Sequence, residues 1–361
     1  MIVIVGAGPI GCYLGEELAK AGKEVSIYEE HPSIGKPVQC TGIITREIEK
    51  LMRLPDNVVV NEINRVRVYS KNRKVELPID DIVIDRAKFD RYLAKKAKEY
   101  GASIYLNQKF IGIRGKNAVF ADRRNKIKKV EAEAIIGADG PLSEVAKAND
   151  MFENRGFYFG MQVRVRGRWD KEVYETWMGS IAPGFFAWLL PESDKTARVG
   201  IAAKTGTKEL FRRFFDIMGL KDKDVIEFQA GLIPIFDKKQ AVKKKRVYLV
   251  GDAAGHVKAS TGGGLVPGMK AARKLAKVLI KGGDYEKELA GLKKELEMHL
   301  RLRKGLDRFS NKDYDRLIGL VGSRKIKKII RKHNRDEAKK LVFKAVMAKP
   351  SVLRFTTKFI N

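Results

Sequence analysis

The chain begins with MIVIVGAGPIGCYLGEELAKAGKEVSIYEE, residues 1–30. The apolar run MIVIV predicts a short buried strand, and the apolar spacing after it predicts a helix that ends near Gly22. VSIYEE predicts a second strand. Gly6, Gly8 and Gly11 lie between the first strand and the helix in the spacing GxGxxG. This order of strand, glycine-rich turn, helix and strand predicts the first unit of a nucleotide-binding α/β fold.

Each glycine of this turn has its own expected role. Gly6 permits the tight turn, Gly8 lets the backbone approach a pyrophosphate, and Gly11 lets the helix pack closely on the strand. The phosphate would lie at the helix N-terminus, where Pro9 is the first expected helical residue. Glu29 ends the second strand, where it can accept hydrogen bonds from a ribose. The pattern predicts a dinucleotide site, and the alternative is a turn that serves packing alone.

Two further turns follow predicted strands. GADG at residues 137–140 precedes a short helical segment, and residues 247–276 read VYLVGDAAGHVKASTGGGLVPGMKAARKLA. In the second of these, an apolar run ends at Gly251-Asp252, where we expect a turn that opens a helix. Small residues and three consecutive glycines follow, and then a further helix-like segment. If all three turns lie side by side at the carboxyl ends of strands, the joint pattern favours a flavin dinucleotide over NAD. Taken singly, Asp139 is better explained as a turn aspartate and Asp252 as a helix N-cap, so the flavin interpretation depends on the joint pattern.

The composition indicates a globular and strongly basic chain. Of its 361 residues 44% are hydrophobic, and 73 basic against 44 acidic residues give a net charge of +29. This length suffices for two or three modules. No apolar run reaches the roughly 20 residues of a membrane-spanning helix. No basic leader precedes the first strand, and the two cysteines and four histidines lack metal-ligand spacing. We therefore expect no metal site and a reducing cytoplasm.

The apolar pattern changes along the chain and predicts three regions. Residues 1–150 and 240–283 carry the strand–turn–helix units and form one discontinuous domain. Residues 151–239 mostly alternate apolar and polar positions, which predicts an antiparallel sheet and a substrate domain. Residues 284–361 are helical in pattern and basic. The predicted fold class is α/β, with a Rossmann-like domain, an inserted antiparallel-sheet domain and a helical C-terminal region.

Four motifs occur in the order seen in one group of flavoproteins. GAGPIG with Glu29, DRAKFDRYLAKKA, GADGPLS and VGDAAG resemble flavoproteins of the p-hydroxybenzoate hydroxylase type. Within that group, GKPVQCTGII at residues 35–44 and GDAAGHVKASTGGGLVPGMKAA resemble the geranylgeranyl reductase family. The resemblance covers most of residues 1–280. It implies FAD as cofactor and saturation of isoprenoid carbon–carbon double bonds, including those of archaeal membrane lipids.

The resemblance also implies residue roles. Arg86 would lie near the FAD phosphates or the ring edge, with a surface arginine at a helix start as the alternative. Cys40 would line the cavity over the flavin, in a segment where Thr41 replaces a glycine, or it is a small buried residue. Cys40, Gly263 and Gly264 are expected at the catalytic centre. The implied cofactor-binding residues are Gly6, Gly8, Pro9, Gly11, Glu29, Cys40, Arg86, Asp139, Gly251, Asp252, Gly263 and Gly264.

APGFFAWLLP at residues 182–191 resembles the family's PxxYxWxFP stretch, which lines the substrate cavity. Phe186, Trp188 and Pro191 are therefore expected to line that cavity. Phe186 stands where the family has tyrosine, which removes a hydroxyl group. The other interpretation is a hydrophobic core strand. His256 lies either near the pyrophosphate or on the surface.

The expected partners follow from the resemblance and from the charge. They are an isoprenoid lipid, an anionic membrane surface on the inner face, and an electron donor. That donor is either acidic, such as a ferredoxin, or NAD(P)H, although no second nucleotide fingerprint occurs. The basic C-terminal helices either lie on a membrane or pack on the body of the protein. A flavin monooxygenase or halogenase of the same fold stays open, as does an RNA-modifying flavoprotein. No basic platform interleaved with aromatic residues supports nucleic-acid binding.

Overall fold

The computed structural model describes residues 1–152, 155–333, 336, 338–348, 355 and 358, and these residues form two compact units. Unit 1 comprises Met1–Val38, Arg86–Gly156 and Pro234–Glu297. Unit 2 comprises Gln39–Asp85, Phe157–Ile233 and Met298–Asn361.

This division differs from the boundaries expected from the sequence in two places. Residues 39–85 fall in unit 2, because β4 (Val59–Tyr69) pairs in parallel with β12 (Val173–Trp177). The C-terminal region expected at residues 284–361 is also divided, because unit 1 extends to Glu297 and unit 2 takes the chain from Met298. Both differences come from pairings between segments that are far apart in the chain.

Unit 1 is built on a six-stranded sheet in the order β16-β17-β10-β1-β2-β6. Strands β17, β10, β1, β2 and β6 are parallel, as expected of a Rossmann-like domain. The strands are β1 (Ile2–Val5), β2 (Val25–Tyr28), β6 (Ser103–Tyr105), β10 (Ala134–Gly137), β16 (Lys243–Lys244) and β17 (Val247–Leu249). All residues of β1, β2 and β10 are buried, which explains their continuous apolar runs.

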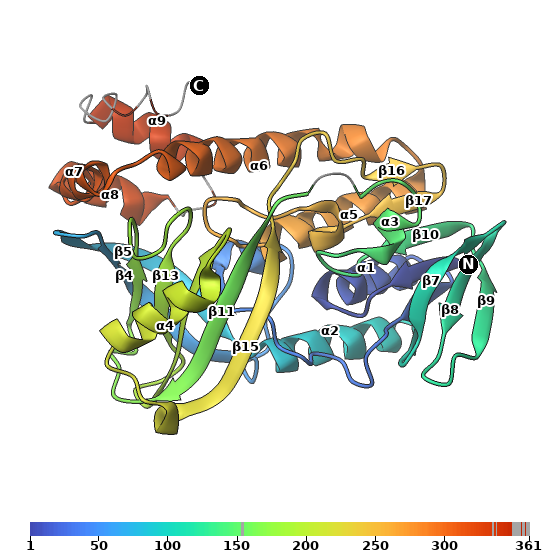
Figure 1. Cartoon of the computed structure of the whole chain (residues 1–361). Coiled ribbons are helices and arrows are strands. Elements are labelled where there is room, and N and C mark those ends of the chain that lie inside the picture. The colour runs from blue at the N-terminus through green and yellow to red at the C-terminus, as the bar shows by residue number, and fades with distance from the viewer. Residues whose placement is uncertain (153–154, 334–335, 337, 349–354, 356–357, 359–361) are drawn as a thin grey trace. The chain divides into compact units, whose positions relative to one another are not determined.

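Helices cover this sheet. Helix α1 packs against both α2 and α5, and Figure 1 shows α1 and α2 side by side. The helices of unit 1 are α1 (Pro9–Lys20), α2 (Arg86–Glu99), α3 (Glu144–Lys147) and α5 (Leu265–Lys281), and α6 (Tyr285–Asp307) continues into unit 2. A separate three-stranded antiparallel sheet contains β7 (Lys109–Arg114), β8 (Asn117–Ala121) and β9 (Ile127–Glu131).

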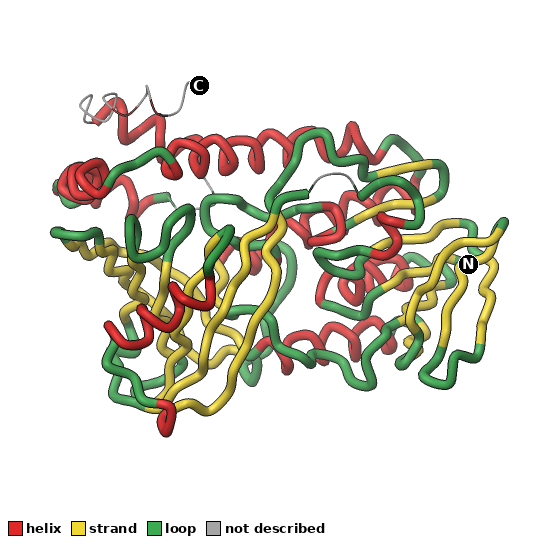
Figure 2. Tube along the Cα trace, viewed as in Figure 1, coloured by secondary structure: helices red, strands yellow, loops and turns green. Residues whose placement is uncertain are grey.

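Unit 2 is built on an eight-stranded sheet in the order β15-β11-β14-β13-β12-β4-β5-β3. Figure 2 shows its long strands in yellow. The antiparallel prediction holds for β11, β14, β13 and β12, but the parallel pair of β12 and β4 makes the sheet mixed. The remaining strands are β3 (Ile43–Thr45), β5 (Lys74–Ile84), β11 (Phe157–Arg166), β13 (Ala187–Pro191), β14 (Thr196–Ala203) and β15 (Val225–Pro234).

The sheet of unit 2 has two different faces. On one face, alternate residues of β11, β13 and β14 pack with α4 (Thr207–Ile217). That cluster includes Val163, Val165, Ala187, Leu189, Val199, Ile201, Phe211 and Phe214. Because side chains alternate along a strand, the intervening residues lie on the opposite face. We call this opposite face the second face; it carries Gln162, Arg164, Trp188, Leu190, Arg198 and Gly200, which the cross-strand register pairs with one another.

The remaining helical elements of unit 2 are short turns and C-terminal helices. They are η1 (Arg46–Lys50), η2 (Asp222–Asp224), α7 (Asn311–Val321), α8 (Arg324–Lys332) and α9 (Ala338–Ala348). Helices α7 and α8 pack against β5. Within the described part of the chain, no helix combines the length and apolar character needed to cross a membrane.

Candidate active site

The three glycine-containing turns lie at one edge of the sheet of unit 1. They follow β17, β10 and β1, which are neighbours and parallel, so their carboxyl ends meet. Backbone hydrogen bonds continue beyond the strands: the Ala138 amide donates to the Val5 carbonyl at 2.8 Å, and the Val250 amide to the Gly137 carbonyl at 3.0 Å. The predicted side-by-side placement of the turns is therefore confirmed. In α/β sheets this edge is the place where ligands bind.

Gly6 and Gly11 are required by close backbone packing. Gly6 has φ of +100°, and a Cβ there would lie 2.4 Å from the Ala138 carbonyl oxygen. A Cβ on Gly11 would lie 2.0 Å from the Gly6 carbonyl oxygen. Neither position tolerates a side chain, because backbone atoms cannot move away as a flexible side chain can. These two glycines bring α1 close to β1 and to the turn after β10.

Gly8 is different, and it supplies the test of whether a dinucleotide fits. It is the N-cap of α1 with φ of −68° and ψ of 177°, a conformation open to any residue. No described atom lies within 4 Å of a Cβ built on it. The chain itself therefore gives no reason for glycine here. A phosphate held by the free amides of the α1 N-terminus would need the space that a Cβ would fill, so the turn fits a pyrophosphate.

Glu29 links this turn to the end of β2. Its Oε2 accepts the Ala7 amide at 2.8 Å, and its Oε1 accepts the His31 amide at 3.0 Å. The His31 Nδ1 lies 2.6 Å from the same Oε1. Each carboxylate oxygen has more than one lone-pair direction, so these bonds orient Glu29 and leave it able to accept from a ribose.

Asp139 serves its own turn. Its carboxylate accepts the Ser143 hydroxyl at 2.6 Å and the Val145 amide at 3.0 Å, at the start of α3. Burial raises the pKa of Asp139, and these hydrogen bonds act in the opposite direction. The geometry is that of the turn aspartate considered as the alternative.

Asp252 lies in a short 3₁₀ turn, η3 (Gly251–Ala254). The helix expected to open at this turn is only this short 3₁₀ element, and the helix-like segment expected after the three glycines is α5, which begins at Leu265. Asp252 instead lies beside the glycine loop: its Oδ1 would be 2.9 Å from a Cβ on Gly264. Burial raises the pKa of Asp252, and the charges of Arg86 and Arg155 act in the opposite direction.

Arg86 begins α2, as expected from the Asp-Arg pattern. Its Nε and one terminal nitrogen each donate to Asp90 at 3.1 Å, one turn along the same helix. This two-pronged pair fixes the guanidinium plane. Arg86 thus supplies a positive charge near Asp252, which offsets part of the rise in the Asp252 pKa that burial causes.

The triple glycine forms part of a tight loop. The Lys258 amide donates to the Gly263 carbonyl at 3.1 Å, and the Gly262 amide donates to the Lys258 carbonyl at 2.8 Å. Gly262 has φ of +70°, which favours glycine. Lys258 is only 4% exposed, and its Cε would be 3.2 Å from a Cβ on Gly263. Gly263 and Gly264 therefore pack against Lys258 and Asp252.

Arg155 is a site residue that the sequence did not reveal. One terminal nitrogen donates to the carbonyls of Asp252 at 3.1 Å and Pro141 at 3.2 Å. The other donates to the Ala253 carbonyl at 2.8 Å and to the Gln240 side chain at 2.6 Å. One guanidinium thus ties the turn after β17 to the turn after β10. Its surrounding sequence, ENRGF, carries no motif that would have indicated this.

His256 is buried, so the surface position considered for it is wrong. It is 1% exposed, and neither ring nitrogen has a hydrogen-bond partner among the described residues. Burial lowers the pKa of His256 to about 3, and the charges of Lys293 and Arg155 contribute in the same direction. The ring is therefore neutral at physiological pH.

Cys40 belongs to unit 2 and is half-buried. The Gly42 amide donates to its Sγ at 3.3 Å. The segment that contains it crosses the second face of the sheet. There the Thr41 and Cys40 carbonyls accept from Arg198, and Gln39 would contact a Cβ on Gly231 at 3.1 Å.

The predicted cavity residues divide between the two faces. Trp188 lies on the second face, and its Nε1 donates to Gln162 Oε1 at 3.1 Å. Gly200 provides the space for this indole, since a Cβ there would lie 2.6 Å from the ring. Phe186 packs edge-on against Trp188, with ring centroids 5.9 Å apart. Strand alternation places Pro191 on the other face, with Ala187 and Leu189.

Comparison with known proteins gives the family. Residues 1–191 match the FAD binding domain family, and residues 189–329 match the lycopene cyclase protein family. A digeranylgeranylglycerophospholipid reductase from Methanosphaera stadtmanae is 30% identical, with 91% of this chain and 92% of the relative covered. The chain belongs to the digeranylgeranylglycerophospholipid reductase family. The same name belongs to a relative from Thermoplasma volcanium that is 26% identical, with 89% of this chain and 91% of the relative covered.

Solved structures agree on the fold. A geranylgeranyl bacteriochlorophyll reductase-like protein from Thermoplasma acidophilum matches with a TM-score of 0.84 and 22% identity, over 99% of this chain and 98% of the other. The flavin-dependent halogenase CmlS matches with a TM-score of 0.69 and 17% identity, over 99% of this chain and 77% of the other. The cofactor of this family member is FAD, as the FAD binding domain match and the fit at Gly8 both indicate.

Proposed function

We propose that this protein is an FAD-dependent reductase that saturates the double bonds of geranylgeranyl chains in membrane lipids. The observation that carries the proposal is the shared second face of unit 2, where the Cys40 segment and the aromatic residues Phe186 and Trp188 lie together. The names of the curated relatives support the same chemistry. The halogenase likeness concerns the fold alone and adds no support for halogenation.

Unit 1 supplies the cofactor site. The amides at the α1 N-terminus hold the pyrophosphate beside Gly8, and Glu29 accepts from the adenosine ribose. Asp252, beside Gly264, is the acceptor for the ribityl hydroxyls. Arg155 keeps the turns after β10 and β17 at a fixed spacing through carbonyl contacts. Reduced FAD, when bound there, would supply a hydride to one alkene carbon, and a proton from solvent would complete the saturation at the other.

Unit 2 supplies the substrate wall. An isolated alkene offers almost no hydrogen-bonding handle, so its orientation depends on apolar shape. Phe186 and Trp188 give that shape, and the bond from Trp188 to Gln162 fixes the indole plane. Cys40, half-buried on the same face, is the residue that contacts the isoprenoid near the reacting carbons.

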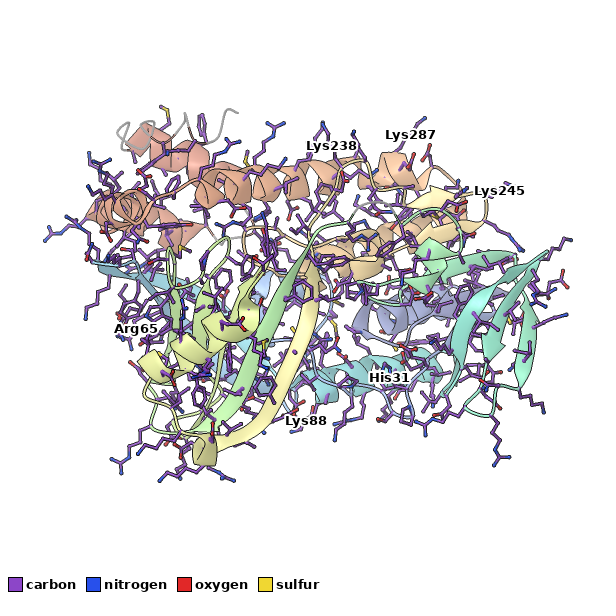
Figure 3. All side chains as sticks on the ribbon, viewed as in Figure 1. His31, Arg65, Lys88, Lys238, Lys245 and Lys287 are labelled. Atoms are coloured by element: carbon purple, nitrogen blue, oxygen red, sulfur yellow. The ribbon has the colours of Figure 1, made fainter. Side chains whose placement is uncertain are left out.

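The basic C-terminal helices meet the lipid surface in this proposal. Helix α8 buries Ile326 and exposes basic side chains along its outer face. Those exposed residues are Arg324, Lys325, Lys328, Arg331 and Lys332. Basic side chains also extend outward in unit 1, including Lys88, Lys245 and Lys287 (Figure 3). Anionic headgroups and an acidic electron-donor protein are the partners that such charge attracts.

The test uses the purified holoprotein under anaerobic conditions. Dithionite reduces the flavin, excess dithionite is removed, and vesicles that contain a digeranylgeranylglycerophospholipid are added. We expect the oxidised-flavin absorbance to return with the unsaturated lipid and to stay bleached with its fully saturated counterpart. Equal behaviour with both lipids would contradict the proposal.

A further inference from the structure

The Cys40 segment is attached to the sheet of unit 2 by one buried arginine. Arg198 lies on β14, on the second face, and is 5% exposed. One of its terminal nitrogens donates to the Cys40 carbonyl at 3.4 Å and to the Thr41 carbonyl. That nitrogen would lie 2.6 Å from a Cβ on Gly42, whose φ of +77° also favours glycine. The turn and the guanidinium are therefore in direct contact.

The rest of the same guanidinium binds the residue that follows β13. Its Nε donates to Glu192 Oε1 at 2.8 Å, and its other terminal nitrogen lies 2.6 Å from that oxygen. Glu192 is 7% exposed and also accepts the Arg164 Nε, through its Oε2, at 2.5 Å. Arg198 thus connects the Cys40 turn to the end of the strand that carries Trp188.

A buried guanidinium bound on three sides is a rigid connection. Arginine presents several donors in one plane, and lysine cannot reproduce such a set of directions. Ordinary packing would not require a buried charge at this place, because burying an ion pair costs desolvation energy that apolar residues do not incur. The carbonyl contacts instead fix the backbone on either side of the Cys40–Thr41 peptide.

We propose that Arg198 is a positioning residue that holds Cys40 in place relative to the Trp188 strand. It acts through the backbone of the turn, because its hydrogen bonds there go to the Cys40 and Thr41 carbonyls, and in this proposal it does not contact the substrate. Its catalytic consequence rests on the proposed function, since that function places Cys40 beside the isoprenoid. Its structural consequence, the order of the Cys40 turn, does not.

The test compares Arg198→Lys with Arg164→Met. Arg164 is a matched control because it also pairs with Glu192 but makes no hydrogen bond to the turn among the described residues. The first measurement is the rate at which iodoacetamide alkylates Cys40, resolved from Cys12 by peptide mass spectrometry. Cys12 is fully buried and serves as an internal marker of global unfolding.

We expect R198K to alkylate at Cys40 at least about fivefold faster than the wild type, through local opening of the turn, while Cys12 stays unmodified. R164M should stay within about twofold of the wild type. A wild-type rate in R198K, or equal acceleration in both variants, would overturn the proposal. If R198K does not fold, the double variant R198M/E192Q removes both charges together. It should likewise alkylate at Cys40 at least about fivefold faster than the wild type, while Cys12 stays unmodified.

The second measurement separates this proposal from the proposed function. R198K should lower kcat for lipid reduction roughly tenfold or more, because small displacements at a reacting centre are costly. Its affinity for FAD should not change. If R198K alkylates faster but the wild-type protein reduces no isoprenoid, the result would support Arg198 as the residue that orders the turn. It would contradict only the proposed function. Slower turnover without faster alkylation would reject the positioning role.

Discussion

Replacement of Gly8 by alanine separates cofactor binding from folding. No described atom lies within 4 Å of the added Cβ, and the backbone angles of −68° and 177° suit alanine. The apoprotein should therefore keep its stability or gain about 0.4–1 kcal/mol, because alanine reduces the entropy of the unfolded chain. The added methyl group would instead occupy the space in which a pyrophosphate approaches the α1 amides.

The expected loss of affinity can be estimated from the contacts involved. A hydrogen bond to a charged group contributes about 1.5–3 kcal/mol, and a displaced pyrophosphate would lose two of them. The Kd for FAD should therefore rise roughly 10²- to 10⁴-fold, at 1.4 kcal/mol for each factor of ten. Fluorescence titration of the apoprotein with FAD measures this, and thermal unfolding of the apoprotein checks the fold.

Gly291→Ala is the matched control for this experiment. Gly291 lies in α6 within unit 1, and a Cβ there also meets no described atom within 4 Å. Its replacement should leave the Kd for FAD unchanged and stabilise the helix by about 1 kcal/mol. If G8A bound FAD as tightly as G291A, the assignment of the pyrophosphate to this turn would be refuted.

Three further predictions concern His256, Arg155 and α8. His256 has a pKa of about 3 in the folded protein against 6.5 in the unfolded chain. As the pH falls below 6.5, the unfolded chain therefore takes up the proton first. The free energy of unfolding that the neutral, buried ring maintains at higher pH is then lost. His256→Leu should therefore remove about 2 kcal/mol of the stability loss between pH 7 and pH 5, and an unchanged pH dependence in denaturant titrations would contradict this. Arg155→Met should leave the Asp252, Pro141 and Ala253 carbonyls without this donor, at a cost of about 1–3 kcal/mol in unfolding free energy for each carbonyl that stays buried, and should weaken FAD binding. Unchanged stability and unchanged FAD affinity would exclude its role in spacing the turns. Exchange of Lys325, Lys328 and Lys332 for glutamine should weaken binding to anionic vesicles at low salt by about 1 kcal/mol of binding free energy for each charge, as measured by co-sedimentation. Unchanged binding would contradict the proposal that α8 lies on the membrane surface.

The site in unit 1 was largely predictable because its signals are local. Each turn directly follows a short buried strand, and glycine spacing reports on backbone contacts within one strand–turn–helix unit. Asp139 shows the limit of this reasoning, since a carboxylate after a strand looks the same whether it binds a ligand or the start of α3. The length of the helical element at Asp252 was unpredictable for a similar reason, because small residues after a strand suit a single 3₁₀ turn as well as the start of a longer helix.

The organisation of unit 2 was harder to predict because long-range pairing decides it. The sequence of β4 alternates apolar and polar residues and so predicts a strand, but it does not predict that β12 is the strand with which β4 pairs. Arg155 and Arg198 were missed for the same reason. Their partners are backbone carbonyls far along the chain, and because every residue has a carbonyl, no residue type indicates which one accepts the bond. In contrast, a glycine in the middle of a strand, such as Gly200, does indicate that a large side chain lies beside it, and here that side chain is Trp188.

The most direct test of the central claim is the mass of the lipid after a single anaerobic turnover. The reduced holoprotein is mixed with a digeranylgeranylglycerophospholipid in excess, quenched, and the lipid is analysed by mass spectrometry. We expect one double bond to gain two hydrogens for each flavin reoxidised. An unchanged lipid alongside reoxidised flavin, or a product that contains added oxygen or halogen once air is admitted, would contradict it.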